Sequence, residues 1–154
     1  LEKIYELDDN LQEEKRGDFL LSFDKERLQL DVIEDFLSKQ SYWAEGRSLV
    51  KIERSIKNSV CLGIYHLGKQ VAFARLVTDK ATFSWLADVV VHKDFRGQGL
   101  GKWLVEAACK FSDQHGIMDM LLATRDAQQL YQRYGGFSPI EDPAKWMRRM
   151  NTDQ

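Results

Sequence analysis

The sequence predicts a single α+β domain in which a mixed, mostly antiparallel sheet of about six or seven strands is flanked by about four helices. Three strand-like runs follow one another with only short turns between them, which is typical of an antiparallel meander. Segments with helical spacing of apolar residues lie on both sides of these runs, and one of them connects two strands. The predicted order of elements is therefore β-α-α-β-β-β-α-β-α-β-β.

The first third of the chain is predicted to supply one strand and two helices. Residues 1–17 are polar and charged and are expected to form a leader or an additional helix, so the domain is placed at residues 18–154. A short apolar run at residues 18–23 predicts the first strand. Asp24 can cap a helix to about residue 38, and Ser48 can cap a second helix to about residue 58.

The middle of the chain predicts the meander and a crossover to a parallel strand. The three strands are expected at residues 59–66, 70–78 and 81–91. Apolar residues recur at helical spacing from Leu100 onward, and we expect this helix to end near Gly116. A strand expected at residues 117–123 follows this crossover helix and is therefore parallel to the third strand of the meander.

The end of the chain predicts one more helix and two strands. Asp126 can cap a helix that the pair Gly135 and Gly136 would end. Two final strands are expected, one from Phe137 onward and one at residues 146–150, because prolines separate the two runs. No repeat or low-complexity tract interrupts this order, which supports a single domain.

Residues 89–102 carry the strongest functional signal. The valines at 89–91 favour extended backbone, and an amphipathic helix begins at Leu100. Three residues without side chains lie at this junction: Gly97, Gly99 and Gly101. Their backbone N–H groups can approach a ligand closely, and the helix N-terminus adds unpaired donors and a partial positive charge. The stretch therefore predicts a site for an anion, most simply phosphate or pyrophosphate.

Spacing separates three glycine-loop chemistries. The sequence does not match the phosphate loop of nucleoside triphosphatases, because Arg96 stands where the first Gly of that pattern belongs and Trp103 replaces its Ser or Thr. The dinucleotide fingerprint fails as well, because Lys102 occupies the position of its third Gly. The pattern that remains is Arg-x-x-Gly-x-Gly, which Arg96, Gly99 and Gly101 satisfy.

The loop at residues 96–101, with the sequence Arg-Gly-Gln-Gly-Leu-Gly, resembles the pyrophosphate loop of the GNAT superfamily of N-acetyltransferases. Residues 127–137, which contain Leu130, Tyr131 and Phe137, resemble a second segment of that family. The resemblance implies acetyl-CoA as co-substrate, no metal, and two central strands that splay apart to form a cleft. The residues expected to bind the cofactor are Val89, Val90, Val91, Arg96, Gly97, Gln98, Gly99, Leu100, Gly101, Lys102 and Asp126. Among these, Asp126 is expected to replace an Asn of the family, because Thr124 occupies the family's position.

The resemblance implies that Tyr131 donates a proton to the departing thiolate. A Tyr in the family pattern Leu-Tyr-x-x-x-Gly-Phe has this role, and a phenol stays protonated at neutral pH. The pattern departs here, because Gly135 and Gly136 insert one extra residue before Phe137. Tyr134 is therefore a rival, and simple core packing is an alternative for both tyrosines.

The attacking amine must lose a proton, and Asp88 is the side-chain candidate for the base. It lies on the strand expected to carry the cofactor. An acid bonded to a neighbouring loop or to Arg75 is an equally good interpretation of Asp88, and a water chain could serve instead. Asp119 and Asp126 are weaker candidates.

The acceptor is expected to contact Tyr42, Trp43 and Arg47, because the corresponding loop of the family borders the acceptor pocket. The two aromatic rings could hold a cationic amine through their faces, or they could only cover an apolar patch. A small-molecule amine or amino-acid-like acceptor is favoured over a protein. The resemblance also allows a non-catalytic acyl-CoA sensor, a transferase for longer acyl chains, and a homodimer.

Composition limits the classes of partner. The formal net charge is −2, and the chain has no basic tail, no long apolar run and no signal-peptide pattern. We therefore expect no nucleic-acid partner, no membrane association and a cytoplasmic location. Cys61 and Cys109 form no C-x-x-C pair and are expected to be buried free thiols. The histidines are scattered along the chain, so no metal site is expected.

Overall fold

A six-stranded sheet forms the centre of the computed structural model, which describes residues 12–152. The strands lie side by side in chain order: β1 (Glu13–Arg16), β2 (Phe19–Ser22), β3 (Val60–His66), β4 (Lys69–Thr78), β5 (Phe83–Val91) and β6 (Asp119–Leu121). Neighbouring strands are antiparallel except β5 and β6, which are parallel. The mixed, mostly antiparallel sheet and the central meander are thereby confirmed.

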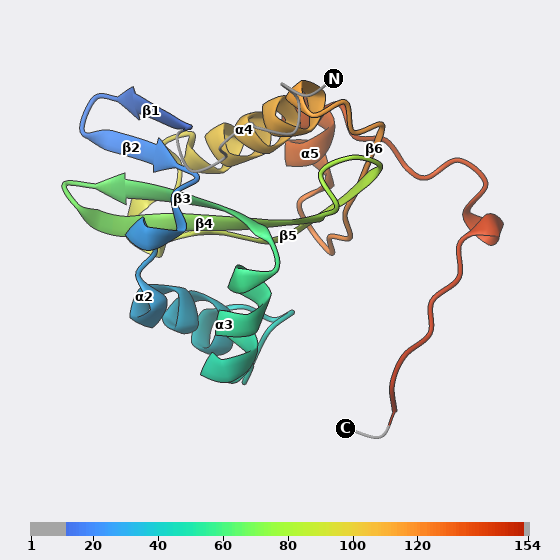
Figure 1. The fold of residues 1–154 in the computed structure, drawn as a ribbon, viewed down its shortest axis with the longest axis horizontal. Helices are drawn as coiled ribbons and strands as arrows, with labels where there is room; N and C mark the ends of the chain where they lie inside the picture. The colour runs from blue at the N-terminus through green and yellow to red at the C-terminus, as the bar shows by residue number, and fades with distance from the viewer. Residues whose placement is uncertain (1–11, 153–154) are drawn as a thin grey trace.

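Helices cover both faces of the sheet (Figure 1). The helices α4 (Leu100–Gln114) and α5 (Gln128–Gly135) lie on one face, and α2 (Leu30–Glu34) and α3 (Leu49–Lys57) lie on the other, with a π-helical turn η3 (Asp35–Gln40) continuing α2. Strand alternation supplies both cores: Leu62 and Ile64 are buried in the cluster that contains α4, whereas Cys61 is buried with α2 and α3. Within residues 12–152, no helix is long and apolar enough to cross a membrane.

The N-terminal part differs from the prediction. Residues 13–16, expected in a leader or additional helix, form β1 and pair with β2, while residues 1–11 lie outside the described residues. Asp24 caps only a short 3-10 turn, η2 (Lys25–Arg27), so the helix expected to residue 38 is broken. The break has a tertiary cause, because the Gln29 side chain bonds to the backbone of Gly68 and Gln70 in the β3–β4 turn region.

The C-terminal part also differs. The strand expected at residues 117–123 is confirmed only as the short β6, and neither strand expected after Phe137 is formed. Residues 137–152 are irregular apart from a 3-10 turn η5 (Pro143–Lys145) and run away from the sheet (Figure 1). Trp146 and Met147 stay exposed, so this run buries too little apolar surface to be held as a strand. The sheet reaches six strands because the hairpin of β1 and β2 extends its opposite edge.

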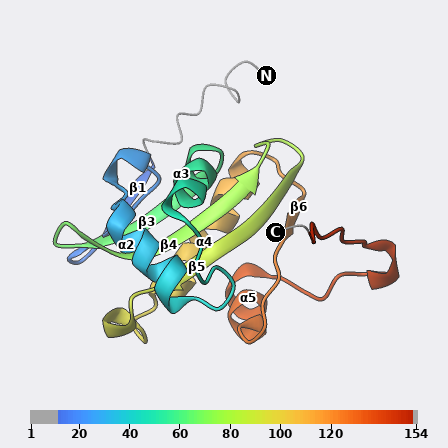
Figure 2. The same cartoon turned by 90° about the horizontal axis from the view of Figure 1, so that it is seen from below.

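The divergence of β5 and β6 positions the site. The two strands pair only from Phe83 to Trp85 of β5, whereas β5 continues to Val91 alongside β4. Figure 2 shows the chain after β6 turning away from β5 toward α5. The splayed central strands are thereby confirmed, and the edge of β5 beyond Trp85 has no partner strand on the β6 side.

Candidate active site

The N-terminus of α4 is an open set of backbone donors. Gly97 and Gly99 have φ of 79° and 82°, a left-handed conformation that glycine adopts without steric cost. No side chain caps α4, and its first turn contains no acidic residue. The first backbone N–H groups of α4 lie ahead of any intrahelical acceptor, and those of Gly97 and Gly99 make no loop hydrogen bond within the described residues. Such a helix N-terminus fits a diphosphate, as the glycine spacing predicts.

The other residues expected to bind the cofactor contribute in different ways. Leu100 is only 4% exposed and packs its side chain into the core with α4, so it can offer only its backbone to a ligand. The Arg96 Nε donates to the carbonyl oxygen of Val91 at 3.2 Å, which ties the loop to the end of β5. Val90 packs its side chain into the α2–α3 core, and Val89 lines the cavity described next.

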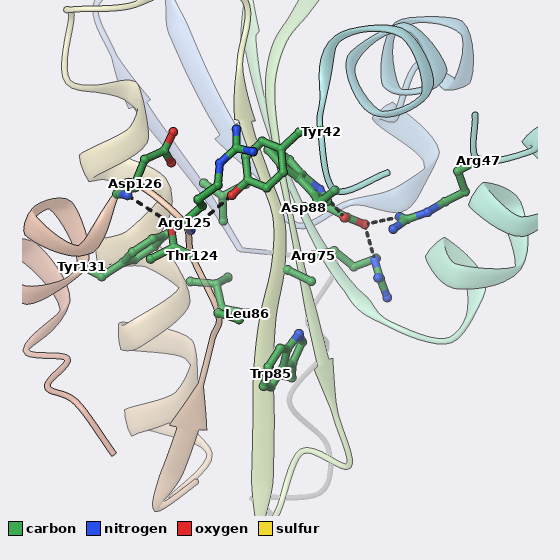
Figure 3. A pocket seen from close by; sticks show the side chains of 15 residues that line it. Tyr42, Arg47, Arg75, Trp85, Leu86, Asp88, Thr124, Arg125, Asp126 and Tyr131 are labelled. Atoms are coloured by element: carbon green, nitrogen blue, oxygen red, sulfur yellow. Dashed lines mark hydrogen bonds and ion pairs between the residues drawn. The ribbon is translucent and has the colours of Figure 1, made fainter. Parts of the chain in front are cut away.

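A cavity of about 640 Å³ opens where β5 and β6 part (Figure 3). Its walls come from the loop between η3 and α3, from β4 and β5, and from α5 with the connection that precedes it. The residues that line it are Tyr42, Trp43, Arg47, Arg75, Trp85, Leu86, Ala87, Asp88, Val89, Ala123, Thr124, Arg125, Asp126, Ala127 and Tyr131. The fold thus brings both residues expected to be catalytic and all three expected to contact the acceptor into one space.

Asp88 is the centre of a buried hydrogen-bond network. Its Oδ1 accepts from the Trp43 Nε1 at 3.0 Å, and its Oδ2 accepts from the Arg47 Nη1 at 2.9 Å and the Arg75 Nε at 2.9 Å. Its side chain is only 2% exposed. Both oxygens are therefore already acceptors for groups of the protein. This geometry favours the alternative in which Asp88 is an anchor for Trp43 and Arg47 rather than the catalytic base.

A β-bulge gives Asp88 this orientation. Phe73 of β4 pairs with Val90, whereas Arg75 pairs with Ala87, so two residues of β5 stand opposite one residue of β4. Asp88 has a φ of 55° at this point, a conformation that costs a non-glycine residue about 1–3 kcal/mol. Its ion pairs offset that cost, and the bulge turns the following segment of β5.

The acceptor loop and the β6–α5 connection meet above the cavity. The Arg125 backbone N–H donates to the Tyr42 hydroxyl at 3.3 Å, and the Arg125 guanidinium lies 3.8 Å from the centre of the Tyr42 ring. The Trp43 ring packs edge-on against Tyr42 at 5.1 Å between centroids. Arg125 and Trp85 were not predicted as site residues; only the position of Arg125 beside Asp126 could have indicated it.

The structure distinguishes the two tyrosine candidates, because only Tyr131 lines the cavity. The Tyr131 side chain lines the cavity, is 9% exposed, and makes no hydrogen bond through its hydroxyl within the described residues. Burial raises the pKa of Tyr131 to about 12, so the phenol keeps its proton at neutral pH. Tyr134 instead places its ring 4.8 Å from the Lys102 ammonium and does not line the cavity.

The additional glycine fits the turn after α5. Gly136 has a φ of 68° and ends α5, while a Cβ on Gly135 would lie 2.6 Å from the Phe137 ring. These two residues let Phe137 fold back, so that its ring packs edge-on against Tyr131 at 5.8 Å. With the inserted residue present, Tyr131 still lines the cavity and still packs against Phe137.

The start of α5 corrects one prediction. Asp126 lines the cavity but does not cap α5, whose N-cap is Ala127. Thr124 takes part in this turn instead, because its Oγ1 accepts from the Ala127 backbone N–H at 3.1 Å. Asp126 remains exposed, with a carboxylate that borders the cavity.

The predictions about a metal site and about the two cysteines concern residues outside the cavity. No cluster of three or more His, Cys, Asp or Glu residues suitable for a metal occurs within residues 12–152. Both cysteines are free, and Cys61 is buried as predicted, whereas Cys109 is only half-buried. Burial raises the pKa of both thiols, that of Cys61 to about 11.

Comparison with known proteins gives consistent matches. A family model described as an acetyltransferase (GNAT) domain matches residues 57–135. A solved structure of a GNAT-family protein from Xanthomonas campestris is 38% identical, with a TM-score of 0.83, over 89% of this chain and 96% of that one.

Two further relatives match over shorter segments. FG08082 of Gibberella zeae is 29% identical over 59% of this chain and 62% of its own length. The protein ycf52 of Gracilaria tenuistipitata, named an uncharacterized N-acetyltransferase, is 31% identical over 66% of this chain and 58% of its own length. The chain thus covers less than two thirds of the length of either relative.

Proposed function

Because the chain belongs to the GNAT superfamily of acetyltransferases, we propose that it transfers an acetyl group from acetyl-CoA to the amine of a small molecule. One observation carries the proposal: the unpaired edge of β5 leads from the donors at the N-terminus of α4 to the cavity that Tyr131 lines. A ligand that follows this edge can place one end on the donors and the other beside the phenol.

Acetyl-CoA, when bound, supplies an acetyl group activated as a thioester. The backbone N–H groups of residues 97–102 would hold its diphosphate, since they lie at the N-terminus of α4, which no side chain caps. The unpaired backbone of β5 at residues 89–91 would hold the pantetheine arm as an added strand does. The residues of this chain fit the group, and no metal is needed to bind it.

Tyr131 would supply the proton that the departing sulfur needs. Its pKa of about 12 keeps the phenol protonated at neutral pH, so the hydroxyl can offer a proton as the sulfur departs. A phenolate of this pKa is a stronger base than a thiolate, whose conjugate acid has a pKa of about 8.5, so the phenolate then recovers its proton from the nitrogen of the attacking amine, directly or through water. The acceptor amine has an ordinary pKa of about 10.4 and must lose a proton before it attacks. Because Asp88 is occupied by three donors, we assign that role to water in the open cavity.

The cavity also supports a small acceptor. Its volume of about 640 Å³ lies within the range of small-molecule sites. Tyr42 and Trp43 are 46% and 42% exposed as residues, so their rings could contact a cationic amine through their faces.

The proposal is tested by measuring CoA release from acetyl-CoA with the purified protein and a panel of small amines. We expect amine-dependent release that is faster than hydrolysis without an amine. Binding of acetyl-CoA in a calorimeter without release to any amine would indicate the sensor instead. Failure to bind acetyl-CoA or CoA at millimolar concentration would refute both functions.

A further inference from the structure

A second, open cavity of about 440 Å³ lies next to the first one, on the side of α3. The side chains that line it are basic or polar: Arg47, Lys51, Arg54, Ser55, Asn58 and Arg75. None of these described residues is acidic. Arg47 and Arg75 also line the larger cavity, so the two spaces share their guanidinium groups.

Within the described residues, Asp88 is the one carboxylate that forms an ion pair with the guanidinium groups at this junction. Arg47 and Arg75 both bind the same oxygen, the Oδ2 of Asp88, and their side chains are only 24% and 14% exposed (Figure 3). One carboxylate compensates one of the two cations, and a partly buried cation without a counter-charge is unfavourable. Arg54 adds a further cation to the lining of the cavity, and the Lys51 side chain lines it as well.

The two guanidinium groups also keep hydrogen-bond donors available. Arg47 uses Nη1 for Asp88, while Arg75 uses Nε for Asp88 and Nη1 for the Ser59 hydroxyl. The Nη2 of each has no acceptor within the described residues. Guanidinium groups bind carboxylate and phosphate oxygens through such paired donors.

This cavity is separate from the donors at the N-terminus of α4. Arg75 lies opposite Ala87 of β5, and the glycine loop begins only after Val91. Because of the bulge, Ala87 to Val91 lies opposite only three residue steps of β4, from Arg75 to Ala72, so the two ends are roughly 10 Å apart at about 3.3 Å per residue. The basic cavity therefore lies at the acceptor end of the cleft and not at the diphosphate.

From the cavity, its charge and its position, we propose that the acceptor amine carries an oxyanion, a phosphate or carboxylate group, which binds among Arg47, Lys51, Arg54 and Arg75. This inference rests on the proposed function, since it names the class of acceptor for the same site. The anion supplies the counter-charge that Asp88 alone does not. The amine then extends from the basic cavity into the larger cavity beside Tyr131.

The kinetic test uses alkylamines of one chain length that end in a phosphate, a carboxylate or a hydroxyl group. We expect kcat/KM to be at least about tenfold higher for one of the anionic amines than for the hydroxyl amine, and the two anions distinguish phosphate from carboxylate. The variant Arg54→Gln should lower this ratio to near one. Lys57→Gln removes a cation from the same helix outside the cavity and should keep the ratio.

A binding test works without acetyl transfer. Inorganic phosphate should raise the Tm of the wild-type protein, of Lys57→Gln and of Gly99→Val, which disrupts the loop before α4. The increase should be at least halved in Arg54→Gln. Equal phosphate effects in Arg54→Gln and the wild type, together with equal kcat/KM for charged and neutral amines, would overturn the inference.

The two proposals fail separately. If neutral and anionic amines are acetylated equally and Arg54→Gln changes nothing, the basic cavity has no role while the acetyltransferase proposal stands. If no amine is acetylated but phosphate still stabilises through Arg54, the acetyltransferase proposal fails while the anion site stands.

Discussion

Asp88 combines a left-handed backbone with a buried carboxylate, and the two features depend on each other. The β-bulge turns the side chain toward α3, where Arg47 and Arg75 can reach a single oxygen at 2.9 Å. Trp43 binds the other oxygen, so one residue fixes the position of the acceptor loop relative to β5. We therefore regard Asp88 as a positioning residue at the base of the cavity.

The replacement Asp88→Asn should reduce the free energy of unfolding by about 3 kcal/mol, because it leaves two partly buried guanidinium groups without a counter-charge. Urea unfolding at pH 7 measures the change. Asp113→Asn removes an exposed carboxylate and should change stability by less than about 0.5 kcal/mol. Equal stability of the two variants would show that the network contributes little.

Tyr131 is the second residue with a role that can be isolated. Tyr131→Phe should lower kcat by about 100-fold while the Kd of acetyl-CoA changes less than about twofold, because only the proton donor is lost. The matched control is Tyr134→Phe, whose ring faces Lys102 and whose kcat should stay near that of the wild type. Steady-state kinetics and calorimetry provide the two measurements. An unchanged kcat in Tyr131→Phe would remove the phenol from the mechanism.

At the scale of elements, the ends of α4 show how a helix is used at one terminus and closed at the other. Gly99 at the N-terminus has a φ of 82° and leaves donors open, whereas Gly116 beyond the C-terminus has a φ of 67° and ends the helix. A Cβ at either position would meet no atom within 4 Å. Both glycines are thus required by backbone conformation rather than by space.

Because a glycine with positive φ lies at each end of α4, the two positions allow a matched test of the loop. Gly99→Val should weaken CoA binding at least tenfold, because a β-branched residue disfavours the left-handed conformation by about 1–2 kcal/mol and displaces the N–H groups. Gly116→Val introduces a comparable strain at the far end of α4 and should bind CoA as the wild type does. Isothermal titration with CoA compares them, and similar Kd values for both variants would contradict the assignment of the loop.

At the scale of the whole molecule, two cores on opposite faces of one sheet hold the site between them. The face with α4 carries Tyr131, and the face with α2 and α3 supports the loop that carries Tyr42 and Trp43. Cys61 is a buried member of the second core, and the residue is 1% exposed. Loss of the Cys61 proton is therefore coupled to unfolding of the domain.

Stability should decline at alkaline pH for this reason. Burial raises the pKa of Cys61 from 9.0 to about 11, so the folded state keeps a proton that the unfolded state releases. The resulting stabilisation is complete below pH 9 and is lost between about pH 9 and 11; two pH units correspond to about 3 kcal/mol. Urea unfolding between pH 8 and 11 measures this slope, and Cys61→Ala should make it shallower. Parallel pH profiles for Cys61→Ala and the wild type would contradict the assignment.

The elements that the sequence predicted correctly are those with strong local signals. Ser48 caps α3 through the Lys51 backbone N–H, and the short turns between apolar runs define the meander of β3, β4 and β5. The errors lie where distant contacts act: Gln29 interrupts the first predicted helix by bonding to the β3–β4 turn region. The end of the chain has extended propensity, but it packs against no partner strand in the structure.

The sequence by itself determined the glycine loop, the helix that follows it and the tyrosine of α5, because spacing within a few residues defines each of them. Tertiary structure alone decided what these residues meet. Asp88 binds Arg47 and Trp43 from 41 and 45 residues away, and this distinguished an anchor from a base. The basic cavity likewise combines α3 with β4, so no local pattern could indicate it. The chemistry of a side chain can be read from the residue itself, but the charges around that side chain depend on which distant segments the fold brings next to it.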